Sequence, residues 1–130
     1  MRILSDDDYE WLRPHLRSVP LGLRDVLAKP EEPFRHVYFI ETGVVSVVNS
    51  VAGGMVEVGT IGCEGLAGLS VFLDADATPS ETFVQVAGSA KRVAADVFAA
   101  GADERPEFRR ILHRYTQAFL TQVAQTAACN

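Results

Sequence analysis

The stretch from Gly59 to Val86 is the part of this sequence best suited to chemistry. It runs GTIGCEGLAGLSVFLDADATPSETFVQV. It starts as a predicted strand, turns on Gly59 and Gly62, and continues into an apolar segment, Leu66–Leu73, that we predict to be a short helix. Backbone N–H groups at a glycine-rich turn before a helix can converge on an anion. The pattern therefore predicts a ligand-binding turn.

The histidines and cysteines predict no catalytic or metal site. His15, His36 and His113 fall on three different predicted elements and form no His-x-His motif of the kind that a metal-dependent β-barrel enzyme requires. Cys63 and Cys129 are far apart, and two cysteines cannot supply the usual four ligands of an iron–sulfur cluster. We therefore expect a non-enzymatic chain with no catalytic residues, no metal and free thiols, in a reducing cytoplasm. Cys63 as a redox-sensing thiol is the alternative, which its acidic and apolar neighbours disfavour.

The composition is that of an ordinary globular domain and limits its partners. Of the 130 residues, 48% are hydrophobic and 22% are charged, which is enough for one core. The formal net charge is −5 and no stretch concentrates Lys or Arg, so we expect no direct binding to nucleic acid. The N-terminus lacks the apolar segment of a signal peptide, and no apolar run approaches the ~20 residues of a membrane span. We expect a cytoplasmic protein that does not contact a membrane.

A short helix and a series of strands precede and follow the glycine-rich stretch. Ser5 followed by three aspartates is a helix N-terminus, and Pro14 limits that helix to a few turns. Alternating or β-branched residues then predict strands at Val19–Leu23, Val26–Leu27, His36–Ile40, Val44–Val51, Met55–Val58, Thr82–Val86 and Lys91–Ala94. This number of short strands indicates a jelly roll or sandwich.

Glycines mark the predicted breaks between those strands. We expect a turn at Glu41–Gly43, with Gly43 at positive φ, and a hairpin turn at Ala52–Gly54. A polar loop is expected at Asp74–Glu81, and a break between two strands at Gly88. Asp96–Ala100 is expected to form one helical turn that Gly101 ends.

The C-terminal part is predicted to be one long amphipathic helix. Pro106 suits a first helical position, and no helix breaker follows it. We therefore divide the chain into residues 1–105 and a helix at 106–130. A helix this long cannot lie entirely on so small a core, so we expect a homodimer that pairs the helix with its second copy. The predicted contacts are the apolar residues at helical spacing, Leu112, Tyr115, Phe119 and Val123.

Three segments resemble the effector domain of bacterial Crp–Fnr-type transcription regulators, which has the cyclic-nucleotide-binding fold. They are HVYFIETGVV at 36–45, IGCEGL at 61–66, and VQVAG with KRV between 84 and 93. The resemblance implies a mainly β jelly roll with an N-terminal helix, followed by a long dimerisation helix. It also implies a sensor that relays a signal to a helix-turn-helix domain. The residues up to Asn130 contain no helix-turn-helix segment after the long helix. We therefore expect this chain to lack a DNA-reading element.

The resemblance also implies which residues would form the ligand cassette, and where the chain departs from it. Nucleotide-binding members use a Glu for the ribose hydroxyl and an Arg with Ser or Thr for the cyclic phosphate. Glu64 corresponds to that Glu, whereas Ser80 and Glu81 stand where Arg and Ser are expected. Loss of the guanidinium forfeits ~2–3 kcal/mol, and Glu81 adds like-charge repulsion. Cyclic AMP and cyclic GMP are therefore expected to bind poorly or not at all. The candidate cassette residues are Gly62, Glu64, Gly65, Leu66, Ser80, Glu81 and Thr82.

Two functions remain open from the sequence alone. One is the sensor and dimerisation half of a transcription regulator, with an unidentified small-molecule effector. The other is a stand-alone module of the same fold that binds no cyclic nucleotide and serves as a structural or interaction domain. Glu64 could stabilise its own turn by accepting backbone N–H bonds instead of contacting a ligand. This alternative is compatible with both functions.

Overall fold

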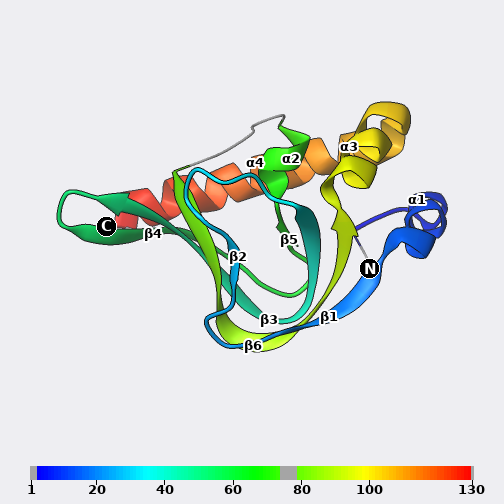
Figure 1. The fold of residues 1–130 in the computed structure, drawn as a ribbon. Helices are drawn as coiled ribbons and strands as arrows, with labels where there is room; N and C mark the ends of the chain where they lie inside the picture. The colour runs from blue at the N-terminus through cyan, green and yellow to red at the C-terminus, as the bar shows by residue number, and fades with distance from the viewer. Residues whose placement is uncertain (1–2, 74–78, 130) are drawn as a thin grey trace.

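In the computed structural model, which describes residues 3–73 and 79–129, six strands form one antiparallel sheet that curls into a roll (Figure 1). The main path has the order β1-β6-β3-β4, while β2 pairs with β6 and β5 pairs with β3. The strands are β1 Arg17–Leu21, β2 Val26–Ala28, β3 His36–Val51, β4 Gly54–Ile61, β5 Leu66–Ala67 and β6 Ser80–Ala94. The helices are α1 Asp6–Leu12, the 3-10 turn η1 Arg13–His15, α2 Leu69–Phe72, α3 Ala95–Glu104 and α4 Pro106–Cys129. The prediction of a mainly β fold with a long C-terminal helix is confirmed.

Two predicted breaks are bends within long strands. The turn expected at Glu41–Gly43 and the break expected at Gly88 are both wrong, because β3 and β6 run continuously through them. Register shifts between Ile40 and Val45 bend the pair there. Gly43 has the expected positive φ, +91°, and a Cβ on Gly88 would lie 2.1 Å from the carbonyl oxygen of Thr42. Gly43 and Gly88 let the backbones of β3 and β6 approach each other closely where the strand pair bends. Each strand therefore bends there and does not end in a turn.

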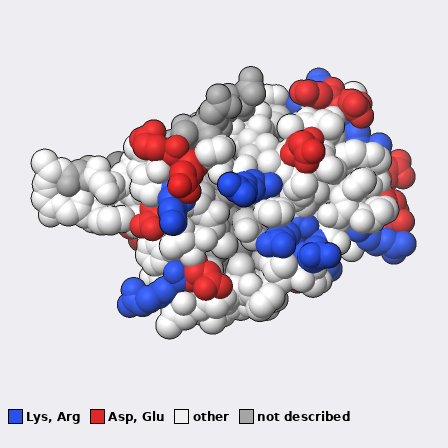
Figure 2. Space-filling model, viewed as in Figure 1, with Lys and Arg blue, Asp and Glu red and all other residues white. Residues whose placement is uncertain are grey.

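The β3–β4 hairpin projects from the roll beside the C-terminal end of α4 (Figure 1). It turns at the predicted place, with Val51 paired to Gly54, and β4 is longer than predicted. No charged residue occurs between Val44 and Val56, and the projecting end shows none in the space-filling view (Figure 2). Elsewhere on that face, acidic and basic side chains are intermingled, so the face carries no basic patch (Figure 2).

Two apolar clusters form the core. The cluster inside the roll includes Val45, Ile61 and Val84. The other lies between the sheet and the helices and includes Phe98 and Phe108, whose ring centroids are 5.4 Å apart in an edge-to-face arrangement. Because Phe108 is fully buried there, the first turns of α4 belong to the same packed body as the roll.

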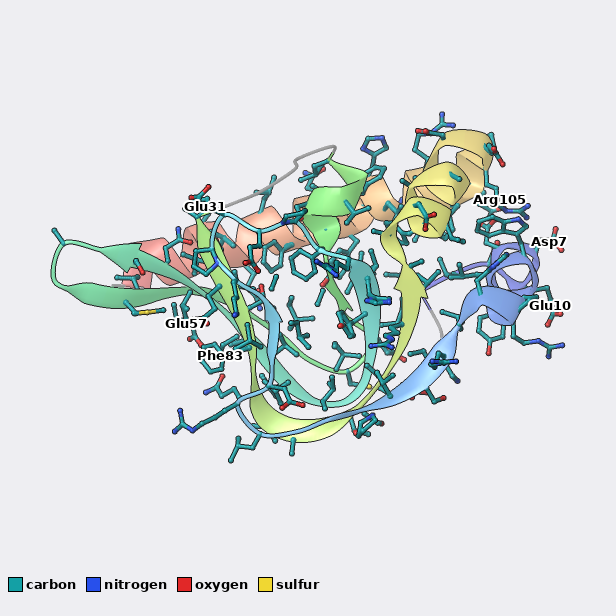
Figure 3. The ribbon with its side chains drawn as sticks, viewed as in Figure 1. Asp7, Glu10, Glu31, Glu57, Phe83 and Arg105 are labelled. Atoms are coloured by element: carbon teal, nitrogen blue, oxygen red, sulfur yellow. The ribbon has the colours of Figure 1, made fainter. Side chains whose placement is uncertain are left out.

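A partly buried ion pair joins α1 to the junction of α3 and α4. Ser5 caps α1 as predicted, accepting the Asp8 N–H at 3.2 Å. Asp8 is only 3% exposed, and Arg105 Nε donates to its Oδ1 at 2.7 Å. The Arg105 guanidinium also lies 5.3 Å from the centroid of the Trp11 ring, and Figure 3 shows Arg105 beside α1. Nothing in the sequence predicted this contact between residues 97 positions apart.

Helix α3 is longer than predicted because Gly101 does not end it. The helix continues to Glu104. A Cβ on Gly101 would lie 2.6 Å and 2.7 Å from Cζ3 and Cη2 of Trp11. Gly101 therefore allows the indole ring to pack against the helix backbone, and the sequence pattern alone could not distinguish this role from helix termination.

We predict that Gly101→Ala destabilises the protein by about 1–3 kcal/mol because the new methyl group overpacks against Trp11. Urea denaturation monitored by circular dichroism would measure the change in free energy of unfolding. Gly53→Ala is the matched control, since nothing lies within 4 Å of a Cβ at that position. An increase in stability for Gly101→Ala, as helix propensity alone implies, would contradict this packing role.

Candidate ligand-binding site

The glycine-rich turn between β4 and β5 uses its own backbone N–H groups. Glu64 N–H donates to the Ile40 carbonyl at 2.9 Å, and Gly65 N–H donates to the Gly62 carbonyl at 2.9 Å. Leu66 N–H donates to the Tyr115 hydroxyl, also at 2.9 Å. Glu64 has a positive φ of 68°. In this conformation of the turn, the three N–H groups bond to acceptors within the protein. The three N–H groups therefore do not converge on an anion in this conformation.

The predicted helix after this turn is much shorter than expected and starts later. Strand β5, Leu66–Ala67, comes first and pairs with β3. Helix α2 has four residues and starts after Gly68, whose φ is +110°. The prediction of a helix over Leu66–Leu73 is wrong in extent, so the anion-binding argument loses its helix N-terminus. The reason is that Leu66 and Ala67 are buried as a strand against β3.

Tyr115 of α4 makes a direct hydrogen-bonded link to this turn. Its hydroxyl accepts from Leu66 N–H and donates to the Leu66 carbonyl at 3.3 Å. Burial raises the pKa of Tyr115 above its usual value of 10.0, and the hydrogen bond to Leu66 partly opposes that rise. The phenol therefore stays protonated and available to donate at neutral pH.

A pocket of about 240 Å³ lies between the roll, α2 and α4, and it is open to solvent where Leu73 and Leu120 are exposed. Three candidate cassette residues, Leu66, Ser80 and Thr82, line it. The described lining residues include no charged side chain, and they are Phe34, Val47, Ile61, Leu66, Gly68, Leu69, Ser70, Leu73, Ser80, Thr82, Thr116, Phe119 and Leu120. The polar side chains of the described wall, Ser70, Ser80, Thr82 and Thr116, all carry hydroxyl groups. The expected loop at Asp74–Glu81 falls partly outside the described residues, but Ser80 and Glu81 belong to β6, which corrects that boundary.

The other candidate cassette residues do not line this pocket. Gly62, Glu64 and Gly65 border a separate pocket of about 250 Å³ between the turn and α4. Glu81 alternates with Ser80 and Thr82 along β6, so its side chain lies on the opposite face of the strand. The structure thus brings together only part of the predicted cassette.

Sequence reasoning missed most of the pocket wall. Val47 and Ile61 could have been assigned to the interior from strand alternation once the register was known. Thr116 and Leu120 are one helical turn apart on α4, a spacing visible in the sequence. The packing of α4 across the mouth of the roll was not visible there, and it is what makes these residues part of a pocket.

The predicted dimer contacts also need correction. Leu112 is 0% exposed and packs in the core of its own chain, so it has no surface for a partner. Tyr115 is held by Leu66, and Phe119 packs against β4, with its ring 3.3 Å from where a Cβ on Gly59 would be. The most exposed large apolar residue on α4 is Leu120, at 61%. Val123 is half-buried.

The described residues contain no group of three or more His, Cys, Asp or Glu side chains that could hold a metal ion. Burial, followed by the charges of Arg92 and Arg35, lowers the pKa of His36. Cys63 is an exposed free thiol, while the side chain of Cys129 lies outside the described part of the chain. No described helix is both long and apolar enough to cross a membrane.

Comparison with solved structures identifies the fold. A cyclic nucleotide-binding domain from Methylobacillus flagellatus KT matches with a TM-score of 0.70 and 14% identity, over 91% of this chain and 67% of that one. The c-di-GMP responsive global regulator CLP of Xanthomonas campestris matches with a TM-score of 0.75 and 14% identity, over 95% and 63%. The N-terminal domain of a transcriptional regulator from Streptomyces coelicolor A3(2) matches with a TM-score of 0.67 and 19% identity, over 91% and 85%.

No protein-family model and no curated protein sequence matches the chain. The structural neighbours are cyclic nucleotide-binding domains and Crp–Fnr-family regulators, and they match over most of its length. The curled sheet, the short helix α2 and the long helix α4 together have the fold of the cyclic-nucleotide-binding domain, as the sequence resemblance predicted.

Proposed function

We propose that this chain is the regulatory sensor domain of a Crp–Fnr-type transcription regulator, with the pocket between the roll, α2 and α4 as its effector site. The observation that carries the proposal is the shared wall of that pocket. Leu66, Ser80 and Thr82 come from the roll, while Thr116 and Phe119 come from α4. A ligand in the pocket would touch both parts at once, so its binding would depend on where α4 lies. The proposal includes no catalytic step.

The link between Tyr115 and Leu66 would carry the signal out of the pocket. Leu66 lines the pocket with its side chain and bonds Tyr115 with its backbone. We consider two positions of α4 relative to the roll. A ligand that moves Leu66 or Phe119 would change the free-energy difference between these two positions. Such a ligand shifts the equilibrium only by its difference in affinity for the two positions.

DNA binding would belong to a different segment of the full regulator. This chain spans 63% of the regulator CLP, so the activity of such a whole protein extends beyond what is described here. The net charge of −5 and the intermingled charges on the face in Figure 2 do not suit a phosphate backbone. The cytoplasm is the proposed location, because a DNA-binding partner segment would act there.

A second copy of α4 is the proposed partner of its outer face. No charged residue occurs between Tyr115 and Asn130, and Leu120 is largely exposed on that half. An uncharged, partly apolar helix face of this kind is suited to pair with itself. The proposed seam therefore keeps Val123, omits Leu112 and includes the exposed part of Leu120, which lies at the edge of the pocket.

Cyclic AMP and cyclic GMP at millimolar concentration are predicted to leave the melting temperature of the chain unchanged. The described lining of the pocket lacks a cation for the cyclic phosphate. A ligand at one hundred times its Kd stabilises a protein by ~2.7 kcal/mol, which thermal melting resolves. Cyclic di-GMP belongs in the same series, since CLP responds to it. A raised midpoint with any of the three would contradict the argument from charge.

Tyr115→Phe is predicted to lower the free energy of unfolding by about 1 kcal/mol, because it removes the hydroxyl that is hydrogen-bonded to the Leu66 backbone. Hydrogen exchange should then become faster both at Leu66 and in the second half of α4, since the two segments lose their direct link. Tyr9→Phe, on α1, controls for the loss of a tyrosine hydroxyl away from the pocket. Faster exchange at Leu66 alone, with α4 unaffected, would count against Tyr115 as the connection.

Light scattering at tens of micromolar protein is predicted to give the mass of two chains. Val123→Arg should shift the equilibrium toward one chain, because a buried unpaired charge is unfavourable at a helix seam. Arg13→Lys, on η1, is a control that leaves α4 unchanged. A wild-type mass of one chain would rule out the proposed seam at that concentration.

A further inference from the structure

We propose that the pocket between the roll, α2 and α4 takes a neutral, largely apolar small molecule that carries one hydrogen-bond donor, rather than an anionic nucleotide. The inference rests on the proposed function, because it specifies the effector class of the same pocket. It follows from the charge, the hydroxyl groups and the volume of the described pocket wall.

The charge of the wall disfavours an ionised ligand. No Lys, Arg, Asp, Glu or His is among the described lining residues. A charged group that leaves water without a partner of opposite charge loses far more free energy than a few hydroxyl groups return. The N–H groups of the glycine-rich turn offer no replacement, because Ile40, Gly62 and Tyr115 already accept them. A neutral molecule avoids this cost.

The Thr116 hydroxyl indicates which hydrogen-bonding group the ligand carries. The Thr116 hydroxyl donates to the Leu112 carbonyl at 2.8 Å, so its oxygen can only accept from a molecule in the pocket. The Ser80 hydroxyl donates to Asn49 Oδ1 and so makes a bond within the protein. The Thr116 oxygen is the group of this wall that we expect to recognise an O–H or N–H on the ligand.

The apolar part of the wall and its volume limit the rest of the ligand. Ile61 and Leu66 from the roll face a space that Phe119 and Leu120 of α4 also line. The volume of about 240 Å³ is below the ~300–1,000 Å³ typical of pockets for drug-sized ligands. A fused bicyclic aromatic molecule with one hydroxyl group suits that volume and those contacts.

The test compares 2-naphthol with 2-naphthoate, which have the same ring system but differ in charge at neutral pH. Isothermal titration calorimetry on the full chain should show saturable binding of 2-naphthol. Binding of 2-naphthoate should be weaker by at least about tenfold, because its carboxylate finds no cation in the pocket. Equal or tighter binding of 2-naphthoate would overturn the proposal, and so would the absence of binding by both probes.

Two threonine variants test whether the probe occupies this pocket. Thr116→Phe fills the pocket from α4 and should abolish 2-naphthol binding. Thr121→Phe is the matched control, because the Thr121 hydroxyl makes the same kind of bond, to the Gln117 carbonyl at 3.0 Å, but its side chain is exposed. Intermolecular nuclear Overhauser contacts from 2-naphthol to Leu66 in the wild-type chain locate the probe independently, should Thr116→Phe fail to fold. Retained binding in a folded Thr116→Phe, or contacts confined to another surface, would overturn the proposal.

Hydrogen exchange separates this inference from the proposed function. If 2-naphthol binds in the pocket and changes the exchange of α4 amides, both stand. If it binds there and α4 is unaffected, the ligand class stands and the relay through α4 is wrong. If cyclic AMP binds in the pocket and 2-naphthol does not, the ligand class is wrong and the sensor function stands.

Discussion

The pairing of β3 with β6 is the interaction on which the rest of the structure depends. The two strands are the longest in the described chain and pair from His36–Ala94 to Asn49–Ser80. Flat strands of that length would make an open sheet. Close approach of the backbones at Gly43 and Gly88 bends both strands together, and the resulting curl encloses an interior. The core of the roll and the pocket both depend on that bend.

The position of α4 follows from the core at the other end of the roll. Phe108 is buried against Phe98, and Leu112 is buried with them, so the first turns of the helix are fixed. The Asp8–Arg105 ion pair holds the start of the helix from the opposite side. From that anchored base, the straight helix carries Thr116 and Phe119 across the mouth of the roll. The helix therefore serves as both a core element and a wall of the pocket.

The pocket between the roll, α2 and α4 has a chemistry that differs from that expected for an anion. Hydroxyl and apolar groups form its described wall, and the backbone donors of the nearby turn are satisfied within the protein. Structural likeness at 12–19% identity shows the fold alone, and ligand specificity depends on a few side chains. The uncharged side chains of the described wall are the basis of the proposal of a neutral ligand.

The sequence by itself determined the mainly β character of the chain, the N-cap at Ser5, the β3–β4 hairpin and the start of α4 at Pro106. Each of these depends on local residue patterns. Only the tertiary structure decided the roles of glycines 43, 88 and 101, because a glycine that permits close packing has the same local signature as one that breaks an element. It also decided which half of the predicted cassette faces the interior and that Leu112 packs inward, because both depend on strand register and on how α4 crosses the roll. Those contacts join residues far apart in the chain, and no local pattern records them.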